Sequence, residues 1–456
     1  MIKKVLSITM VLTLLLGCEK DVTPAPKTIL TGSIINPTDS LLTIVGSDHF
    51  RDTIKVDTNG KFRDTLDLMP GSYLLSYGKL FWRVYTENGY ELDISFNTKR
   101  FNETLAYKGI GGNENTYVFA KLQKQRTEMG LREEAMNIIN DSSLIQLETL
   151  REQALLFLEQ NSTLLPSFKT LEKRNIGYGY LLDLKRLQKR DTIKNVTGLN
   201  KEIEVLEREL TYDNAMDFLF SSSYRRLVED YYRDLAKSSA LANGRDQDIA
   251  YLQSILKNGN DTIKNSLAFD FAKYGITYTN DLEAFYELYV EIATNAHYKK
   301  VVAEDYEILR KVAKGAPSPN FENYENYLGG KTSLSDLEGS YLFIDVWATW
   351  CGPCRYEIPY LKKLEEKYHG KNIRFVSISI DRHKDRDKWK EMVKSKELGG
   401  VQLLADSDWE SSFVKSYLIK GIPRFIILDP KGNIIDANSP TPSSGELEAI
   451  FDEFEL

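Results

Sequence analysis

Two cysteines, Cys351 and Cys354, stand at the junction of two sequence patterns. Residues 341–346 form an apolar run of the kind found in buried strands, and residues 353–368 have the spacing of a helix. Two cysteines with two residues between them close too short a loop to brace a fold. We therefore expect the pair to carry chemistry, at a point where a strand leads into a helix.

The same alternation of apolar runs and amphipathic stretches continues to the C-terminus. Further strands are expected at 373–380 and at 401–404, and a hairpin is expected to pair 425–428 with 433–435. Further helices are expected at 385–396, at 409–417 and from residue 444 onward. Strands that alternate with helices favour a mixed α/β sheet covered on both faces. Gly315-Ala316-Pro317-Ser318-Pro319 cannot continue a helix, so this α/β domain is expected to cover residues 314–456.

A chain of 456 residues is too long for one compact core, and two further regions precede the α/β domain. Residues 28–110 alternate apolar and polar positions in short stretches, which predicts a small antiparallel β domain. Asn59-Gly60 and Asn88-Gly89 are expected to form type I′ hairpin turns, in which both residues need positive φ. Residues 111–313 instead repeat apolar side chains at spacings of three and four, which predicts a helical region.

The N-terminus has a pattern of its own. Lys3 and Lys4 precede an apolar run that ends at Gly17-Cys18 and is shorter than the roughly 20 residues needed to span a membrane. This resembles a bacterial lipoprotein signal, which implies removal of residues 1–17 and attachment of lipid to Cys18. An ordinary secretory signal is the alternative. Residues 18–27 then form a linker, and we expect a lipid-anchored protein of the bacterial cell envelope that faces the periplasm.

The composition disfavours several other classes of function. A formal net charge of −7, without a long basic run, argues against nucleic-acid binding. The four histidines have no ligand spacing and two cysteines supply only two ligands, so no metal site is expected. No nicotinamide or flavin fingerprint occurs, and we expect no cofactor beyond the redox-active cysteine pair itself.

The residues around the cysteines point to a family. They read Ile344-Asp345-Val346-Trp347-Ala348-Thr349-Trp350-Cys351-Gly352-Pro353-Cys354-Arg355. With the entry segment Gly315 to Phe321, the stretch Ser333-Leu334-Ser335-Asp336-Leu337 and the distant Gly421-Ile422-Pro423, they closely resemble the thioredoxin fold. Within that fold the resemblance is to the membrane-anchored TlpA/ResA-like thiol-disulfide oxidoreductases, and it covers residues 315–456. The β domain is also similar to β domains attached to such lipoproteins.

A helix that starts at the cysteine pair gives each cysteine a different role. Cys351 faces unsatisfied N–H groups whose partial positive charge stabilises a thiolate, which makes it the nucleophile. Cys354, one turn further on, is within reach to attack the mixed disulfide and release the product. Pro353 presets the first turn of the helix. Gly352, Pro353 and Trp350 are expected to contact the substrate.

Two carboxylates and an Ile-Pro pair complete the expected site. The resemblance implies that Asp345 is a buried acid behind the cysteines and that Glu357 tunes the thiols. Burial raises the pKa of such a carboxyl, so that it can shuttle a proton near neutral pH. The alternative for Glu357 is an exposed helix position. Pro423 matches a proline that follows a cis peptide bond beside the cysteines, and Ile422 matches a residue whose backbone pairs with substrate.

The resemblance implies reduction of disulfides in exported proteins, such as apocytochrome thiols in cytochrome c biogenesis, with a membrane thiol donor that recharges the pair. The alternatives are an oxidant or isomerase of the same fold, a peroxiredoxin-like antioxidant, and an envelope binding protein with an incidental redox domain. Ala348 disfavours the peroxidase, because the attacking cysteine of a peroxidase normally stands three positions after a threonine or serine.

Overall fold

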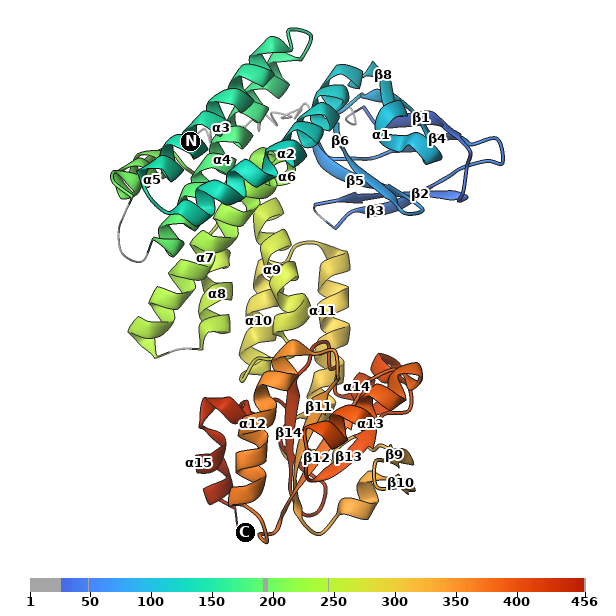
Figure 1. Ribbon diagram of the computed structural model, residues 1–456, viewed down its shortest axis with the longest axis vertical. Helices are drawn as coiled ribbons and strands as arrows, with labels where there is room; N and C mark the ends of the chain where they lie inside the picture. The colour runs from blue at the N-terminus through green and yellow to red at the C-terminus, as the bar shows by residue number, and fades with distance from the viewer. Residues whose placement is uncertain (1–25, 48, 192–195, 245, 455–456) are drawn as a thin grey trace, which may run out of the picture. The chain divides into compact units, whose positions relative to one another are not determined.

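The computed structural model describes residues 26–47, 49–191, 196–244 and 246–454 (Figure 1). The predicted signal segment 1–17 and Cys18 lie outside the described residues. Among the described helices, none is both long and apolar enough to cross a membrane. The chain divides into two compact units, residues 1–200 with 219–221 and residues 201–218 with 222–456, so the division falls inside the predicted helical region.

The first unit begins with two four-stranded sheets, of order β4-β1-β7-β8 and β3-β2-β5-β6. Their strands are β1 (Thr28–Ile35), β2 (Leu41–Gly46), β3 (Arg51–Lys55), β4 (Lys61–Leu66), β5 (Gly71–Tyr77), β6 (Leu80–Thr86), β7 (Glu91–Asn97) and β8 (Ala106–Ile110). Strand β1 pairs with β4 in the antiparallel sense and with β7 in parallel. Leu30 and Ile94 of one sheet share a core with Leu42 and Leu75 of the other, as the predicted period of two requires.

Both tight turns of this β domain differ from the predicted type I′ hairpins. Gly60 and Gly89 have φ of +75° and +80°, but neither Asn59 nor Asn88 has a positive φ. The Gly60 N–H donates to the Asp57 carbonyl, so a single left-handed glycine closes that turn. Each turn also carries the chain from one sheet to the other, β3 to β4 and β6 to β7. The type I′ assignment is therefore wrong at both places, although an antiparallel bridge between Val56 and Phe62 flanks the turn at Asn59-Gly60.

Helices follow the β domain, as the spacing of apolar residues predicts. The first unit contains α1 (Phe101–Thr104), α2 (Gly112–Ile138), α3 (Asp141–Gln160) and α4 (Pro166–Arg190). The chain passes between the two units within α5 (Leu199–Arg208) and α6 (Ala215–Phe220). The second unit continues with α7 (Ser222–Asn243), α8 (Gln247–Leu256), α9 (Asp261–Gly275), α10 (Leu282–Ile292) and α11 (Ala296–Leu309). Buried Leu147, Leu150 and Leu158 in α3 confirm the helical period.

A seven-stranded sheet of order β10-β9-β13-β12-β11-β14-β15 forms the C-terminal domain of the second unit. Its strands are β9 (Tyr324–Asn326), β10 (Lys331–Thr332), β11 (Tyr341–Trp347), β12 (Ile373–Ser379), β13 (Val401–Leu404), β14 (Arg424–Leu428) and β15 (Ile434–Asp436). Strand β11 pairs with β12 in parallel and with β14 in the antiparallel sense. This mixed sheet confirms the fold class predicted for this part of the chain.

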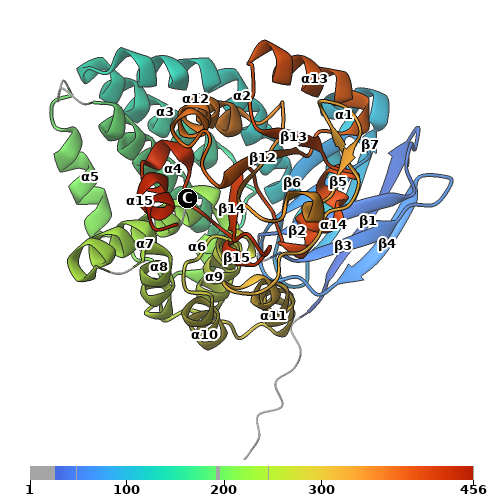
Figure 2. The same cartoon turned by 90° about the horizontal axis from the view of Figure 1, so that it is seen from below.

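Helices cover both faces of the sheet (Figure 2). They are α12 (Gly352–Lys367), α13 (Arg386–Ser395), α14 (Ser412–Ser416) and α15 (Leu447–Asp452). Leu361 of α12 and Phe451 of α15 pack with Phe343 on one face. Trp389 of α13 and Phe413 of α14 belong to the core on the other face. The carboxyl end of β11 leads directly to α12, and this junction positions the cysteine pair.

Candidate active site

The first turn of α12 carries the cysteine pair. Cys351 is the N-cap residue of α12, and Gly352 and Pro353 open the helix. Cys351 Sγ accepts a hydrogen bond from the Cys354 backbone N–H, with an N–S distance of 3.1 Å. The two sulfurs form a disulfide, and both residues are buried. Because N–H groups in a first helical turn have no partner within the helix, this one can stabilise a thiolate on Cys351 after reduction.

The loop between β11 and α12 is held by a buried acid that the sequence analysis did not single out. Asp381 lies two residues after the end of β12 and is buried. Its carboxylate accepts hydrogen bonds from the Thr349 N–H at 2.9 Å and from the Thr349 hydroxyl at 2.7 Å. The Ser379 hydroxyl donates to the same carboxylate at 2.8 Å. Asp381 therefore fixes the residues directly before Cys351. An acid at the carboxyl end of a buried parallel strand is the sequence signal that marks it.

The segment before β14 lies against the nucleophilic cysteine. The Ile422–Pro423 peptide bond is cis. The carbonyl oxygen of Ile422 is 3.7 Å from Cys351 Sγ. Seventy-one residues separate these two positions, and the antiparallel pairing of β14 with β11 brings them together. Ile422 thus contacts the nucleophilic cysteine, and Pro423 follows it across the cis peptide bond.

Asp345 in β11 is buried on the side of the sheet that α12 covers. Phe343, two residues earlier, packs against α12, and the period of two places Asp345 on the same face. Asp345 Oδ1 has no hydrogen-bond partner among the described residues. Burial, and then the negative charges of Glu357 and Glu365, raise the pKa of Asp345 to about 8. This carboxyl therefore holds a proton at pH 7 and releases it slightly above neutrality.

Glu357 in α12 is buried and hydrogen-bonded, in contrast to the exposed helix position of the alternative interpretation. Its carboxylate accepts from the Ser443 N–H and from the Ser443 hydroxyl, each at 2.8 Å. Ser443 lies in a short turn of helix just before α15, and no local sequence pattern marks it as a partner of Glu357. Glu357 thus ties α12 to the segment before α15, and its charge reaches Asp345.

The two tryptophans before the cysteines have different environments. Trp347, at the end of β11, is buried in the core of the domain, whereas 56% of Trp350 is exposed. The Trp350 ring is 6.4 Å from the ring of Trp409. Trp350 also lines an open cavity of about 580 Å³, together with Thr349 and Met392. Of the two, Trp350 is the one placed to meet a partner molecule, and Trp347 is part of the core.

This arrangement is suited to one kind of chemistry. A sulfur at a helix N-terminus with an amide directed at it is an activated nucleophile when reduced. A second, buried sulfur one turn away can displace a partner from the first, provided that it loses its proton. Asp345 supplies a buried acceptor whose pKa of about 8 lies near that of a thiol. Together these groups can pass two electrons between a dithiol and a disulfide.

Comparison with known proteins agrees with this interpretation. Residues 313–451 match the family model described as Redoxin. The thiol-disulfide oxidoreductase ResA of Bacillus subtilis (strain 168) is 26% identical over 124 residues, which cover 27% of this chain and 66% of that relative. The thioredoxin-like protein YneN of the same strain is 28% identical over 141 residues, which cover 31% of this chain and 80% of YneN.

Two solved structures are similar to the same part of the chain. A solution structure from Bacteroides vulgatus is 50% identical, with 31% of this chain and 91% of that chain covered and a TM-score of 0.28. A thiol-disulfide oxidoreductase from Bacteroides fragilis NCTC 9343 is 30% identical; the match covers 29% of this chain and 98% of that chain, with a TM-score of 0.27.

The family match and the curated relatives define the C-terminal domain as a thioredoxin-fold domain of the Redoxin family. Within that family the domain is TlpA/ResA-like, as the residues around Cys351 and Cys354 indicated. The chain therefore carries a domain of the thiol-disulfide oxidoreductase type after its β domain and its helices.

Proposed function

We propose that this protein reduces disulfides in exported proteins at the bacterial cell envelope. The observation that carries the proposal is the Cys351–Cys354 disulfide at the first turn of α12, with the Cys354 amide directed at Cys351 Sγ. The Cys-Gly-Pro-Cys sequence and the neighbouring acids Asp345 and Glu357 favour the reducing direction, by similarity to anchored relatives of this fold.

The proposed reaction is a dithiol–disulfide exchange in two steps. The Cys351 thiolate attacks one sulfur of the substrate disulfide, which forms a mixed disulfide and releases the other substrate sulfur as a thiolate. In the fraction of molecules in which Asp345 is ionised, Cys354 transfers its proton to this carboxylate, attacks Cys351 Sγ and releases the second substrate sulfur as a thiolate. The substrate gains two electrons, its two thiolates take up one proton from Asp345 and one from water, and the protein ends in the disulfide form that the structure shows.

The location and the partners in this proposal come from the sequence. The segment 1–17 and Cys18 support a lipid anchor that holds the redox domain at the membrane surface. A membrane thiol donor then returns two electrons to Cys351 and Cys354 after each turnover. The cysteine pair itself serves as the redox group, without a bound metal or nucleotide.

The direct test is reduction of a protein disulfide by matched cysteine variants of the full chain. Insulin, with dithiothreitol as electron donor, is a suitable substrate. Cys351→Ser is expected to abolish the catalysed rate, because it removes the attacking sulfur. Cys354→Ser is expected to lose turnover. When this variant is first reduced, freed of dithiothreitol and then mixed with insulin, it should accumulate a mixed disulfide that non-reducing electrophoresis detects. Catalysis by the Cys351→Ser variant at the wild-type rate would refute the proposed reaction.

A further inference from the structure

Residues in the connection between α9 and α10, far from the cysteines in sequence, hold the start of β14. Arg424 Nη1 donates to the Thr277 carbonyl at 2.7 Å and to Asn438 Oδ1 at 2.6 Å. The Arg424 guanidinium lies 4.3 Å from the centre of the Tyr278 ring. Asn438 Nδ2 in turn donates to the Tyr278 carbonyl at 3.0 Å. The connection between α9 and α10 is therefore bound to the residue that follows Pro423.

The residues before Ile422 are held from the same side. Lys420 Nζ donates to the Lys273 carbonyl at 3.0 Å and forms an ion pair with Asp305 of α11. A Cβ atom added to Gly421 would lie 2.5 Å from the Tyr278 hydroxyl, so Tyr278 packs directly on this glycine. Because Ile422 contacts Cys351, Tyr278 belongs to the immediate surroundings of the active site.

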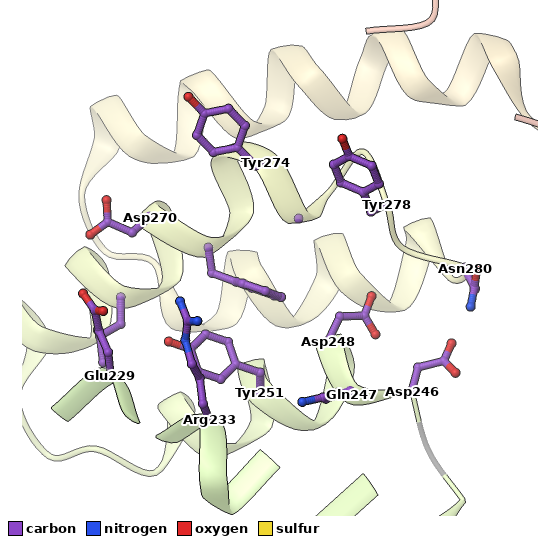
Figure 3. A pocket seen from close by; sticks show the side chains of 13 residues that line it. Glu229, Arg233, Asp246, Gln247, Asp248, Tyr251, Asp270, Tyr274, Tyr278 and Asn280 are labelled. Atoms are coloured by element: carbon purple, nitrogen blue, oxygen red, sulfur yellow. The ribbon is translucent and has the colours of Figure 1, made fainter. Parts of the chain in front are cut away.

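Tyr278 is also part of the wall of a pocket in the helices of the second unit (Figure 3). The pocket has a volume of about 580 Å³ and lies among α7, α8, α9 and the connection to α10. Four carboxylates line it, against one guanidinium. The carboxylates are those of Glu229, Asp246, Asp248 and Asp270, and the guanidinium is that of Arg233.

Charge is distributed unevenly along this pocket. Figure 3 shows Glu229 and Asp270 at one end of the pocket, with Arg233 nearby. Asp246 and Asp248 lie toward the other end, on the side of Asn280. Neither Asp246 nor Asp248 forms an ion pair with any described residue. Among the described residues that line this pocket, the carboxylates therefore outnumber the cationic groups, and Asp246 and Asp248 lie at the end of the pocket near Tyr278.

Aromatic side chains supply the remaining wall of the pocket. Tyr251, Phe271, Tyr274 and Tyr278 line it. Aromatic faces attract cations, and carboxylates bind ammonium and guanidinium groups through charge-assisted hydrogen bonds. The apolar stem of a lysine or arginine can also pack on such rings while its charged group reaches an acid. The chemistry of the lining thus matches a long cationic side chain.

We propose that this pocket receives a lysine or arginine side chain of the polypeptide whose disulfide is presented to Cys351. The inference rests on the proposed function and adds a substrate preference to it. Tyr278 packs on Gly421, the residue before Ile422, and also lines the pocket, so the pocket adjoins the segment with which a bound polypeptide would pair. The helices of the second unit thereby select basic sequences next to a disulfide.

Peptide substrates test this preference with the pre-reduced full chain. Each peptide carries one cysteine that is disulfide-bonded to the same small neutral thiol, and lysine is scanned through about four positions on each side. Norleucine at the same position is the neutral isostere. The wild-type protein is expected to reduce at least one lysine peptide about fivefold faster than its norleucine partner, the size of one partly exposed charge pair. Raising the ionic strength is expected to reduce that ratio.

Charge-neutral variants identify the pocket as the source of the preference. Asp246→Asn with Asp248→Asn is expected to bring the lysine-to-norleucine rate ratio close to one. Glu304→Gln, at an exposed acid on α11 outside the pocket, is the matched control and is expected to keep the wild-type ratio. A ratio unchanged by the double variant, or a wild-type protein that reduces all peptides equally, would overturn the inference alone. A wild-type protein that reduces none of them would instead refute the proposed function.

Discussion

Two buried carboxylates near the cysteine pair differ in how their charge is stabilised. Glu357 accepts two hydrogen bonds from Ser443, whereas Asp345 Oδ1 has no partner among the residues that the structure describes. A carboxylate that accepts hydrogen bonds keeps its charge more readily than one that does not. Burial raises the pKa of Asp345 to about 8, so this carboxyl holds a proton at neutral pH.

Replacing Asp345 by Asn is expected to stabilise the oxidised protein, and to do so more strongly as the pH rises. The pKa of this carboxyl is 3.8 without the fold and about 8 within it, so folding takes up a proton between these values. Wild-type stability therefore falls with rising pH in that window, by up to about 1.4 kcal/mol per unit from this group. Urea unfolding should show a gain for Asp345→Asn that is about 3 kcal/mol larger at pH 7.5 than at pH 5.

The matched control for this experiment is an exposed acid of the same domain. Asp387 of α13 has a side chain that is 99% exposed, and Asp387→Asn is expected to leave the pH dependence of stability unchanged. An equal gain for Asp345→Asn at both pH values would show that the pKa of Asp345 is not raised. The role of Asp345 as proton acceptor is tested by a separate measurement. Asp345→Asn should release substrate from the mixed disulfide at least about tenfold more slowly than the wild-type protein at pH 7.

At the scale of elements, the cysteine pair depends on a loop that two strands hold in place. Asp381, which follows β12, binds both the N–H and the hydroxyl of Thr349 in the loop between β11 and α12. If that loop shifts, Cys351 moves from the N-terminal position of α12 and loses part of the stabilisation that the helix gives its thiolate. Asp381 is thus expected to be a positioning residue rather than a participant in the exchange.

Asp381→Asn is expected to lower the free energy of unfolding by about 1–3 kcal/mol, because an amide cannot accept from all the donors that the carboxylate now satisfies. It should also raise the pKa of the Cys351 thiol in the reduced protein, as measured by the thiolate absorbance during titration. Ser379→Ala, which removes only one donor to Asp381, is the graded control and should leave that pKa near its wild-type value. An unchanged thiol pKa in Asp381→Asn would argue against the positioning role.

The elements of the C-terminal domain could be predicted from the sequence because their patterns are strong. The apolar run before Cys351 and the helical spacing after it appear as β11 and α12. The type I′ turns were predicted wrongly because Asn-Gly pairs also occur where a single left-handed glycine is enough, as at Gly60. Local sequence does not reveal that the strands on either side of such a turn belong to different sheets.

At the scale of the whole molecule, Tyr278 and Gly421 provide a test of coupling between the helices and the redox domain. Gly421→Ala is expected to lower the free energy of unfolding by about 1–3 kcal/mol, since its Cβ would lie 2.5 Å from the Tyr278 hydroxyl. Tyr278→Phe removes that hydroxyl, and the double variant should recover about 1 kcal/mol or more of the loss. Urea unfolding of the two single variants and the double variant measures this coupling.

The control for this comparison of single and double variants is a glycine with open space around it. No heavy atom lies within 4 Å of a Cβ built on Gly177 of α4, so Gly177→Ala is not expected to couple to Tyr278→Phe. Strictly additive effects of Gly421→Ala and Tyr278→Phe on the free energy of unfolding would show that Tyr278 does not pack on Gly421 in solution.

Contacts of this kind lie beyond what the sequence could reveal. The Arg424–Thr277 hydrogen bond joins residues 147 positions apart, and neither residue stands in a motif. The cysteines, Asp345, Glu357 and the Ile-Pro pair could be named in advance because a resemblance to known sequences marked each position. The pocket at Tyr278 is formed by helices whose individual patterns indicate only burial and exposure, so the three-dimensional packing was needed to find it.

The reduction potential of the Cys351–Cys354 pair tests the central claim most directly. It should be measured on protein that lacks residues 1–18, by equilibration in graded thiol–disulfide buffers and counting of free thiols. The account predicts a value near or below about −250 mV, in the range of reducing thioredoxin-like proteins. A value above about −180 mV would contradict it, because a pair with that potential would oxidise or isomerise its substrates instead of reducing them.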